Sequence, residues 1–151
     1  MTARKHQALF EHSPWVEARA AARPSSGDRH ADLMAVVAEA NDDERLALIR
    51  AHPELAGKAA IDRTLTDASA AEQASAGLDR LTPDEFARFH DLNAAYAKRF
   101  GFPFIICVRL TDKAGILAAM ESRLANDRDS EIATAIAEIG KITALRLKDI
   151  S

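Results

Sequence analysis

His52, in the middle of the chain, is the residue best placed for acid–base chemistry. It follows residues 42–51, a stretch predicted to be helical because Asn41 and Glu44 form a capping-box pattern at its start. Pro53 disfavours the α conformation at the preceding residue, so the helix is expected to end at or near His52. The last turn of a helix presents unpaired carbonyls and a partial negative charge, which favour a protonated imidazole. His52 is therefore a candidate proton donor, and simple capping of helix carbonyls is the alternative.

A second polar group lies on the helix predicted for residues 67–76. Ser69, Glu72 and Gln73 have i, i+3 and i+4 spacing, which places a hydroxyl, a carboxylate and a primary amide on one face. The carboxylate can polarise an imidazole, and the amide can pair with a ureido or lactam edge. The alternative is a solvated polar face on an alanine-rich helix.

The apolar run from Phe102 to Val108 is predicted to be extended, because it is rich in β-branched residues and contains Pro103. No other part of the chain resembles a partner strand, so its peptide groups need other partners. Surrounding side chains and water are one possibility, and a polar, ring-shaped ligand with amide edges is the other. Arg109 follows the run and could bind a substrate carboxylate through its forked donors, or form an ordinary ion pair.

The remaining candidates for chemistry are weaker. His6, His12, His30 and His90 lack metal-binding spacing, and the chain has no phosphate-binding loop and no nucleophile elbow. Cys107 lies inside the apolar run, where a small buried hydrophobe is expected rather than a nucleophile.

Composition narrows the class of protein. The 151 residues are 48% hydrophobic and carry a net charge of -3, from 20 Lys and Arg against 23 Asp and Glu. There is no basic block to bind nucleic acid, no apolar stretch of membrane-spanning length and no apolar signal segment at the amino terminus. A single cysteine excludes an intrachain disulfide and a cysteine-based zinc cage. We expect one cytoplasmic domain spanning residues 1–151.

Helical periodicity dominates the elements that must position these residues. The fold is expected to be all-α, a single compact multi-helix domain with one short extended apolar segment near residues 102–109. The clearest helix start is Thr82-Pro83-Asp84-Glu85, and Gly101 ends that helix. Ser13 is expected to cap a helix that contains Trp15. The other helices are predicted at 31–40, 42–51, 67–76, 113–124 and 130–147, the last burying Ile132, Ile136, Ile139 and, more weakly, Thr143.

Six strings in this order resemble the OHCU decarboxylase family (2-oxo-4-hydroxy-4-carboxy-5-ureidoimidazoline decarboxylase, the last enzyme of urate-to-allantoin conversion). The resemblance covers about residues 10–147 and is carried by Glu11–Val16, Ile49–Gly57, Ser69–Leu78, Leu92–Tyr96, Phe100–Arg109 and Glu138–Ile142. It implies an all-helical homodimer that forms (S)-allantoin with loss of carbon dioxide and without a cofactor or metal. One departure is Ser25-Ser26-Gly27 after Arg23-Pro24, where family members often have phenylalanine, and it affects local packing or the entrance rather than the chemistry.

The resemblance also implies roles for individual residues. His52 would be the catalytic acid. Our own mechanistic hypothesis adds that Glu72 orients and polarises His52 and the substrate hydroxyl. The substrate-binding residues would be Pro53, Ser69, Gln73, Phe104, Ile105, Ile106, Cys107, Val108 and Arg109. A carboxylate next to a conjugated imine or carbonyl already has an electron sink, which agrees with chemistry that needs no cofactor. Two alternatives remain: an enzyme acting on another ureido or imide intermediate of purine or pyrimidine breakdown, and a non-catalytic helical interaction module.

Overall fold

The computed structural model describes residues 10, 13–52, 54–55 and 67–150, without the side chains of residues 67–69 and 150. Within these residues every regular element is a helix and there is no strand, which confirms the all-α expectation. The elements are α2 (Trp15–Ala21), α3 (Arg29–Glu39), α4 (Asp42–Arg50), α6 (Asp67–Ser75), α7 (Pro83–Phe100), the 3-10 turn η1 (Val108–Leu110), α8 (Lys113–Arg123) and α9 (Arg128–Ile150).

The two predicted capping boxes are present. At α4 the Asn41 side chain accepts from the Glu44 amide at 2.8 Å, and the Glu44 carboxylate accepts from the Asn41 amide at 3.2 Å. At α7 Thr82 and Glu85 make the same reciprocal pair. Gly101 ends α7 with φ of 80°, a left-handed conformation that suits glycine.

Three other helix starts differ from the prediction. The N-cap of α2 is Pro14, without a side-chain cap, so the expected capping by Ser13 is wrong. Helix α3 begins two residues early because Asp28 accepts from the Ala31 amide at 3.0 Å. Helix α9 also begins two residues early, and Asp127 accepts from the Ser130 amide at 2.7 Å. In both helices an aspartate satisfies a first-turn N–H group that would otherwise lack a partner.

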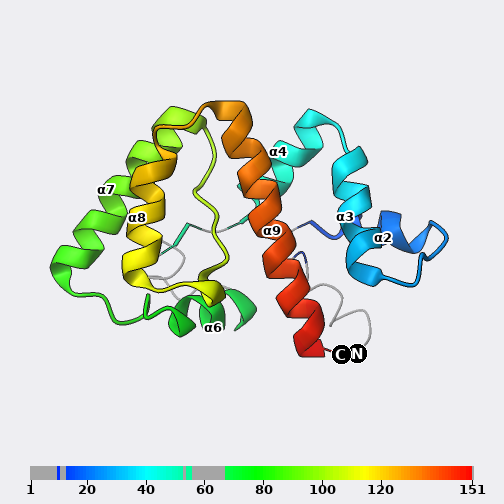
Figure 1. Cartoon of the computed structure of the whole chain (residues 1–151), viewed down its shortest axis with the longest axis horizontal. Helices are drawn as coiled ribbons and strands as arrows, with labels where there is room; N and C mark the ends of the chain where they lie inside the picture. Colours follow the sequence, from blue (N-terminus) through cyan, green and yellow to red (C-terminus); the bar gives the residue numbers. More distant parts are fainter. Residues whose placement is uncertain (1–9, 11–12, 53, 56–66, 151) are drawn as a thin grey trace.

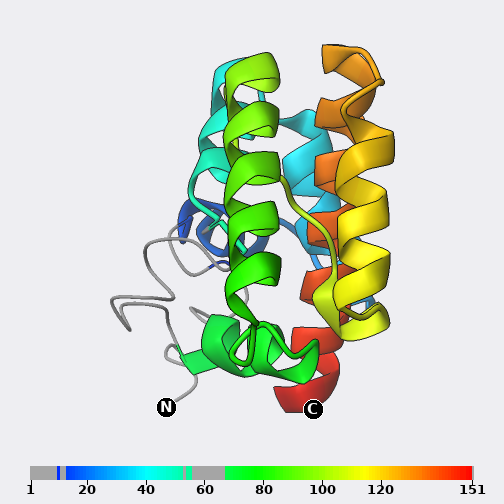
Figure 2. The same ribbon diagram turned by 90° about the vertical axis from the view of Figure 1, so that its left-hand side faces the viewer.

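Helix α9 runs between two helix pairs, α7–α8 on one side and α2–α3 on the other (Figure 1). It packs against α3 and α4, α7 packs against α8, and α6 packs against η1. The connection from α7 to α8 runs back along the α7–α8 pair before it reaches η1 (Figures 1 and 2). This arrangement brings the end of α4, α6, the connection and the carboxyl half of α9 toward one region. None of the described helices is long and apolar enough to cross a membrane.

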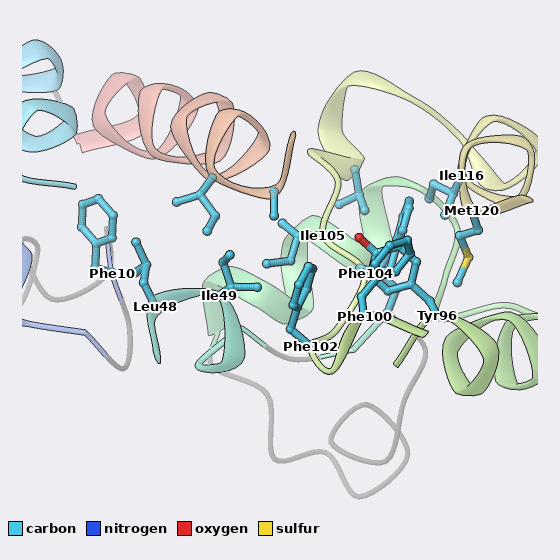
Figure 3. Close-up of a cluster of buried hydrophobic side chains, with 14 of the residues drawn as sticks. Phe10, Leu48, Ile49, Tyr96, Phe100, Phe102, Phe104, Ile105, Ile116 and Met120 are labelled. Carbon is cyan, nitrogen blue, oxygen red and sulfur yellow. The ribbon is translucent and has the colours of Figure 1, made fainter. Parts of the chain in front are cut away.

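Aromatic side chains anchor the connection in the core (Figure 3). Phe102 and Phe104, two residues apart, are both buried against Tyr96, with ring centres 5.9 and 5.3 Å from the tyrosine ring. Phe100 lies 4.6 Å from the same ring. Side chains of alternate residues point the same way in an extended chain, which agrees with the prediction for residues 102–104, and the backbone of Cys107 is also extended, with φ of -75° and ψ of 93°. The segment is thus covered by the core rather than exposed for a partner, which counts against the interaction-module alternative.

The buried stripe of α9 was predicted only in part. Ile139 and Thr143 are buried, while Ile132 and Ile136 are half-buried against the core. The stripe also holds charged residues that the apolar pattern did not predict to be buried: Glu131, Glu138 and Arg146.

Candidate active site

One pocket brings the predicted site residues together. It encloses about 470 Å³, including the open space at its mouth. It is lined by His52, Leu55, Glu72, Gln73, Phe104, Ile105, Ile106, Cys107, Val108, Arg109, Ile142 and Arg146. Every predicted site residue whose side chain the structure describes therefore lies at this pocket. Pro53 lies outside the described residues, and Ser69 is placed only by its backbone in α6.

His52 lies just beyond the end of α4, as Pro53 led us to expect. Its amide donates to the carbonyl of Ile49 at 3.1 Å, and its ring Nδ1 lies 2.9 Å from the carbonyl oxygen of Leu48. Because a carbonyl oxygen can only accept, Nδ1 carries a hydrogen and Nε2 is the nitrogen that gains or loses a proton. The capping and pocket-lining interpretations are therefore compatible. The helix carbonyl fixes the ring orientation at the pocket wall.

The chain beyond His52 is held by two side-chain amides. Gln73 Nε2 donates to the carbonyl of Glu54 at 3.4 Å, and Asn93 Nδ2 donates to the carbonyl of Leu55 at 2.9 Å. Gln73 and Asn93 are both 5% exposed, and they come from α6 and α7. These contacts tie the segment that carries the histidine to two helices. They also place the Gln73 amide at the pocket in a defined orientation.

Glu72 is bound by an arginine that the sequence analysis did not identify. Arg146 Nε donates to Oε2 of Glu72 at 2.8 Å, and Nη2 of Arg146 donates to Oε1 of Glu72 at 2.7 Å. The two side chains are 7% and 14% exposed, so this bidentate pair is largely shielded from water. The hydrogen bonds that the structure describes for this carboxylate thus lead to α9. Its predicted action on the His52 ring remains a proposal.

Spacing on α9 could have pointed to Arg146. It lies three residues after the buried Thr143 and seven after the buried Ile139, on the stripe that faces the protein interior. A charged residue at such a position is buried, and a buried charge needs a partner. Ile142 precedes Thr143 on the same helix and was also missed. Leu55, three residues after His52 in the sequence, lines the pocket as well and was not predicted.

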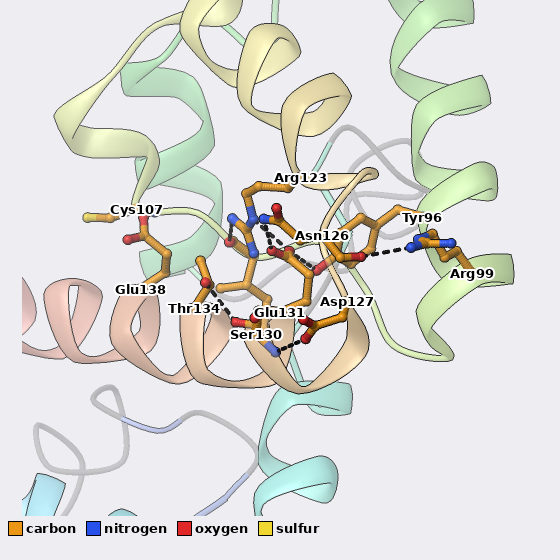
Figure 4. A network of polar contacts seen from close by, with 11 residues as sticks. Tyr96, Arg99, Cys107, Arg123, Asn126, Asp127, Ser130, Glu131, Thr134 and Glu138 are labelled. Atoms are coloured by element: carbon orange, nitrogen blue, oxygen red, sulfur yellow. Dashed lines mark hydrogen bonds and ion pairs between the residues drawn. The ribbon is translucent and has the colours of Figure 1, made fainter.

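Two peptide groups of the extended segment form hydrogen bonds with side chains (Figure 4). The carbonyl of Ile105 accepts from the guanidinium of Arg123 at 2.7 Å, and the amide of Cys107 donates to Glu138 at 3.0 Å. The segment ends where the carbonyl of Cys107 accepts from the Leu110 amide and begins η1. The extended conformation therefore stops at Cys107, two residues short of the predicted limit at Arg109.

Arg109 and Cys107 lie at one wall of the pocket with different environments. Arg109 donates to both carboxylate oxygens of Asp149, at 2.7 and 3.3 Å, in an ion pair that is partly open to solvent. Cys107 is 2% exposed, and its burial raises the pKa of the thiol. A buried, protonated thiol is a poor nucleophile, in agreement with the sequence-based interpretation.

Among the described residues, no group of three or more His, Cys, Asp and Glu side chains is arranged to hold a metal ion. The departure at Ser25-Ser26-Gly27 lies elsewhere, because the Ser26 amide donates to the Asp32 carboxylate on α3. None of these three residues lines the pocket, and they lie in the connection between α2 and α3.

Comparison with known proteins identifies relatives over most of the chain. A family model described as OHCU decarboxylase matches residues 3–148. The 2-oxo-4-hydroxy-4-carboxy-5-ureidoimidazoline decarboxylase of Halalkalicoccus jeotgali is 43% identical over 147 residues, covering 95% of this chain and 81% of the relative. Its counterpart in Haloferax volcanii is 41% identical over 145 residues, covering 93% and 83%. A crystal structure of OHCU decarboxylase in the presence of (S)-allantoin has the same fold, with a TM-score of 0.77 at 22% identity, covering 95% of this chain and 94% of that one.

Proposed function

Because this chain belongs to the OHCU decarboxylase family, we propose that it converts 2-oxo-4-hydroxy-4-carboxy-5-ureidoimidazoline to (S)-allantoin and carbon dioxide, the final step of urate degradation. One observation carries this proposal. The imidazole of His52, the Glu72–Arg146 ion pair and the extended segment that ends at Cys107 line a single pocket. This set offers a proton donor, fixed charges and peptide groups to one small polar ligand.

The reaction needs little beyond orientation and one proton. The bond between the carboxylate carbon and the ring carbon breaks, carbon dioxide leaves, and the electron pair spreads into the adjacent conjugated imine or carbonyl. The imine nitrogen takes up a proton and the hydroxyl gives one up, which leaves a ring carbonyl. We propose that His52 protonates the neighbouring ring carbon, which bears the ureido group, from Nε2 and on one face only. The Leu48 carbonyl supports this role, because it holds Nδ1 and so fixes the direction of Nε2.

We propose that the charged pair orients the substrate. Arg146 fixes the carboxylate of Glu72 through two hydrogen bonds, so Glu72 can accept a hydrogen bond from the substrate hydroxyl in a fixed direction. The proposed partners of the ureido and lactam edges are Pro53, Ser69, Gln73 and the peptide groups of residues 104–108, with Arg109 at the rim. Developing negative charge would be stabilised by Arg146 without large rearrangement.

The test is a coupled circular-dichroism assay with urate, urate oxidase and hydroxyisourate hydrolase. Adding the protein should speed the formation of dextrorotatory allantoin. His52→Ala should lower the rate by about 10²–10⁴-fold, the usual contribution of a general acid. His90→Ala, at an exposed histidine of α7, is the matched control and should leave the rate unchanged. Turnover by His52→Ala at the control rate would refute the proposed role of the histidine.

We further propose that residues 1–151 form one domain, and that the protein acts in the cytoplasm as a homodimer. The single domain is supported by the match of one family model to residues 3–148. The dimer rests on the family resemblance, and the cytoplasmic location is supported by the single cysteine, which agrees with a reducing compartment. Light scattering coupled to size-exclusion chromatography should give about twice the chain mass of 16.4 kDa. A mass equal to one chain at micromolar concentration would refute the dimer.

A further inference from the structure

Two buried side chains hold alternate peptide groups of the segment that lines the pocket. Arg123 on α8 donates to the carbonyl of Ile105, and Glu138 on α9 accepts from the amide of Cys107. Each of these charged side chains belongs to a residue that is only 8% exposed. Figure 4 shows both reaching the segment from the side of α8 and α9.

The spacing of these two contacts determines which way the N–H and C=O groups of the residue between them, Ile106, point. In an extended chain, successive residues direct their N–H and C=O groups to opposite edges. Ile105 and Cys107 therefore share one edge, which Arg123 and Glu138 occupy. The amide and carbonyl of Ile106 face the other edge. Within the described part of the chain, these two groups have no protein hydrogen-bond partner. Ile106 also lines the pocket, so its peptide groups are the ones available to a ligand there.

The side chain of Arg123 is itself held rigidly. Its Nε donates to Glu131 at 2.7 Å, and its guanidinium carbon lies 4.3 Å from the ring centre of Phe104. Glu131 is fully buried and also accepts from Tyr96 at 2.6 Å and from Asn126 at 2.9 Å. A network in which each charge has several partners confines the Ile105 carbonyl to one position.

We propose that Glu138 and Arg123 are positioning residues of the active site, which fix the Ile105–Cys107 edge so that the Ile106 peptide groups bind the ureido or lactam edge of the ligand. The inference rests on the proposed function for the identity of that ligand. Neither residue needs to touch the substrate. Their effect passes through two hydrogen bonds to the backbone.

The experiment compares three variants, with (S)-allantoin as the probe. Glu138→Ala removes the acceptor for the Cys107 amide and should raise the Kd for (S)-allantoin about 10-fold or more, as expected when a buried hydrogen bond is lost. Glu138→Gln keeps an acceptor oxygen and should restore the affinity to within about 3-fold. Lys141→Ala is the matched control, because Lys141 contacts the other carboxylate oxygen of Glu138, at 2.5 Å, and should leave the affinity unchanged.

Amide hydrogen exchange, measured by NMR, gives a readout that does not depend on catalysis. The Cys107 amide should exchange slowly in the wild type, in Glu138→Gln and in Lys141→Ala, and at least 10-fold faster in Glu138→Ala. Should Glu138→Ala fail to fold, Glu138→Asp replaces it, because it keeps the charge but withdraws the acceptor by one methylene group.

Each outcome distinguishes the two proposals. If the wild type neither forms nor binds (S)-allantoin, the proposed function fails, and the exchange pattern alone decides whether the side chains position the segment. If Glu138→Ala keeps wild-type exchange at Cys107 or wild-type affinity, positioning by Glu138 is refuted and the proposed function stands. Equal losses in Glu138→Ala and Glu138→Gln would show that the charge matters rather than the acceptor, and would also overturn the inference.

Discussion

Replacing Arg146 with methionine should destabilise the protein much more than the same replacement of Arg109. Both arginines line the pocket, and both donate two hydrogen bonds to one carboxylate, Glu72 and Asp149 respectively. The pairs differ in burial. The side chains of Arg146 and Glu72 are 7% and 14% exposed, whereas those of Arg109 and Asp149 are 30% and 56% exposed.

The expected magnitudes follow from this difference. Removing one partner of a buried pair leaves the other charge uncompensated, at a cost of about 3–5 kcal/mol. The pocket is open at its mouth, so we expect the lower end, about 3 kcal/mol for Arg146→Met. An exposed pair contributes only about 0–1 kcal/mol, which is the loss expected for Arg109→Met. For a chain of this length the corresponding falls in Tm are about 6–12 °C and less than about 4 °C.

Thermal unfolding of both variants at one fixed protein concentration measures the difference. The double variant Glu72→Gln/Arg146→Met provides the internal check, because it removes the Glu72 charge that Arg146→Met leaves unpaired and should recover part of the loss. If Arg146→Met lowers Tm no more than Arg109→Met does, the pair is not shielded from water as the structure indicates. A double variant no more stable than Arg146→Met would show that lost packing, not the unpaired carboxylate, causes the effect.

Three further outcomes are expected. Burial raises the pKa of Glu17 to about 7 despite the nearby Arg29, so its stabilising contribution is present at pH 4.5 and lost as the pH rises through about 7. The urea midpoint of the wild type should therefore fall between pH 5 and pH 8 relative to that of Glu17→Gln. The same pH dependence of the midpoint in both proteins would contradict this prediction. Gly101→Ala should lower the free energy of unfolding by about 1–2 kcal/mol, because φ is positive at this position. At Gly140 the added methyl group would contact only the end of the Met34 side chain, so Gly140→Ala should lower it less in the same urea denaturation assay. Iodoacetamide should alkylate Cys107 slowly at pH 8, and saturating (S)-allantoin should slow it further; rapid reaction of the folded protein would contradict the burial.

The sequence predicted local structure well where the signal is local. The capping boxes at Asn41 and Thr82 depend on side chains three residues apart, so the sequence contains all of the information. The starts of α3 and α9 were placed late because Asp28 and Asp127 were not recognised as caps. Aspartate is a common cap, but it is also common in loops, and only the backbone geometry distinguishes the two.

The site was predicted as far as its residues lie in recognisable strings. His52, Glu72 and the segment from Phe104 to Arg109 were named from the sequence, and all of them line the pocket. Arg146 was not named because its partner Glu72 lies 74 residues away. No local pattern identifies such a pair, and only the packing of α9 beside α6 creates it. The same holds for Glu138, whose contact with Cys107 spans 31 residues.

Helix α9 organises the site through charged residues on its buried stripe. Glu131 binds Arg123 of α8 and Tyr96 of α7, Glu138 binds the backbone of Cys107, and Arg146 binds Glu72 of α6. A buried charge is costly unless its partner is in place, so each contact penalises any displacement of the element that it holds. One long helix thus fixes the acidic side chain and the peptide segment relative to each other. The histidine is fixed separately, by the last turn of α4. Because α4 packs directly against α9, these two means of positioning share one rigid frame, which is what a reaction that depends on orientation requires.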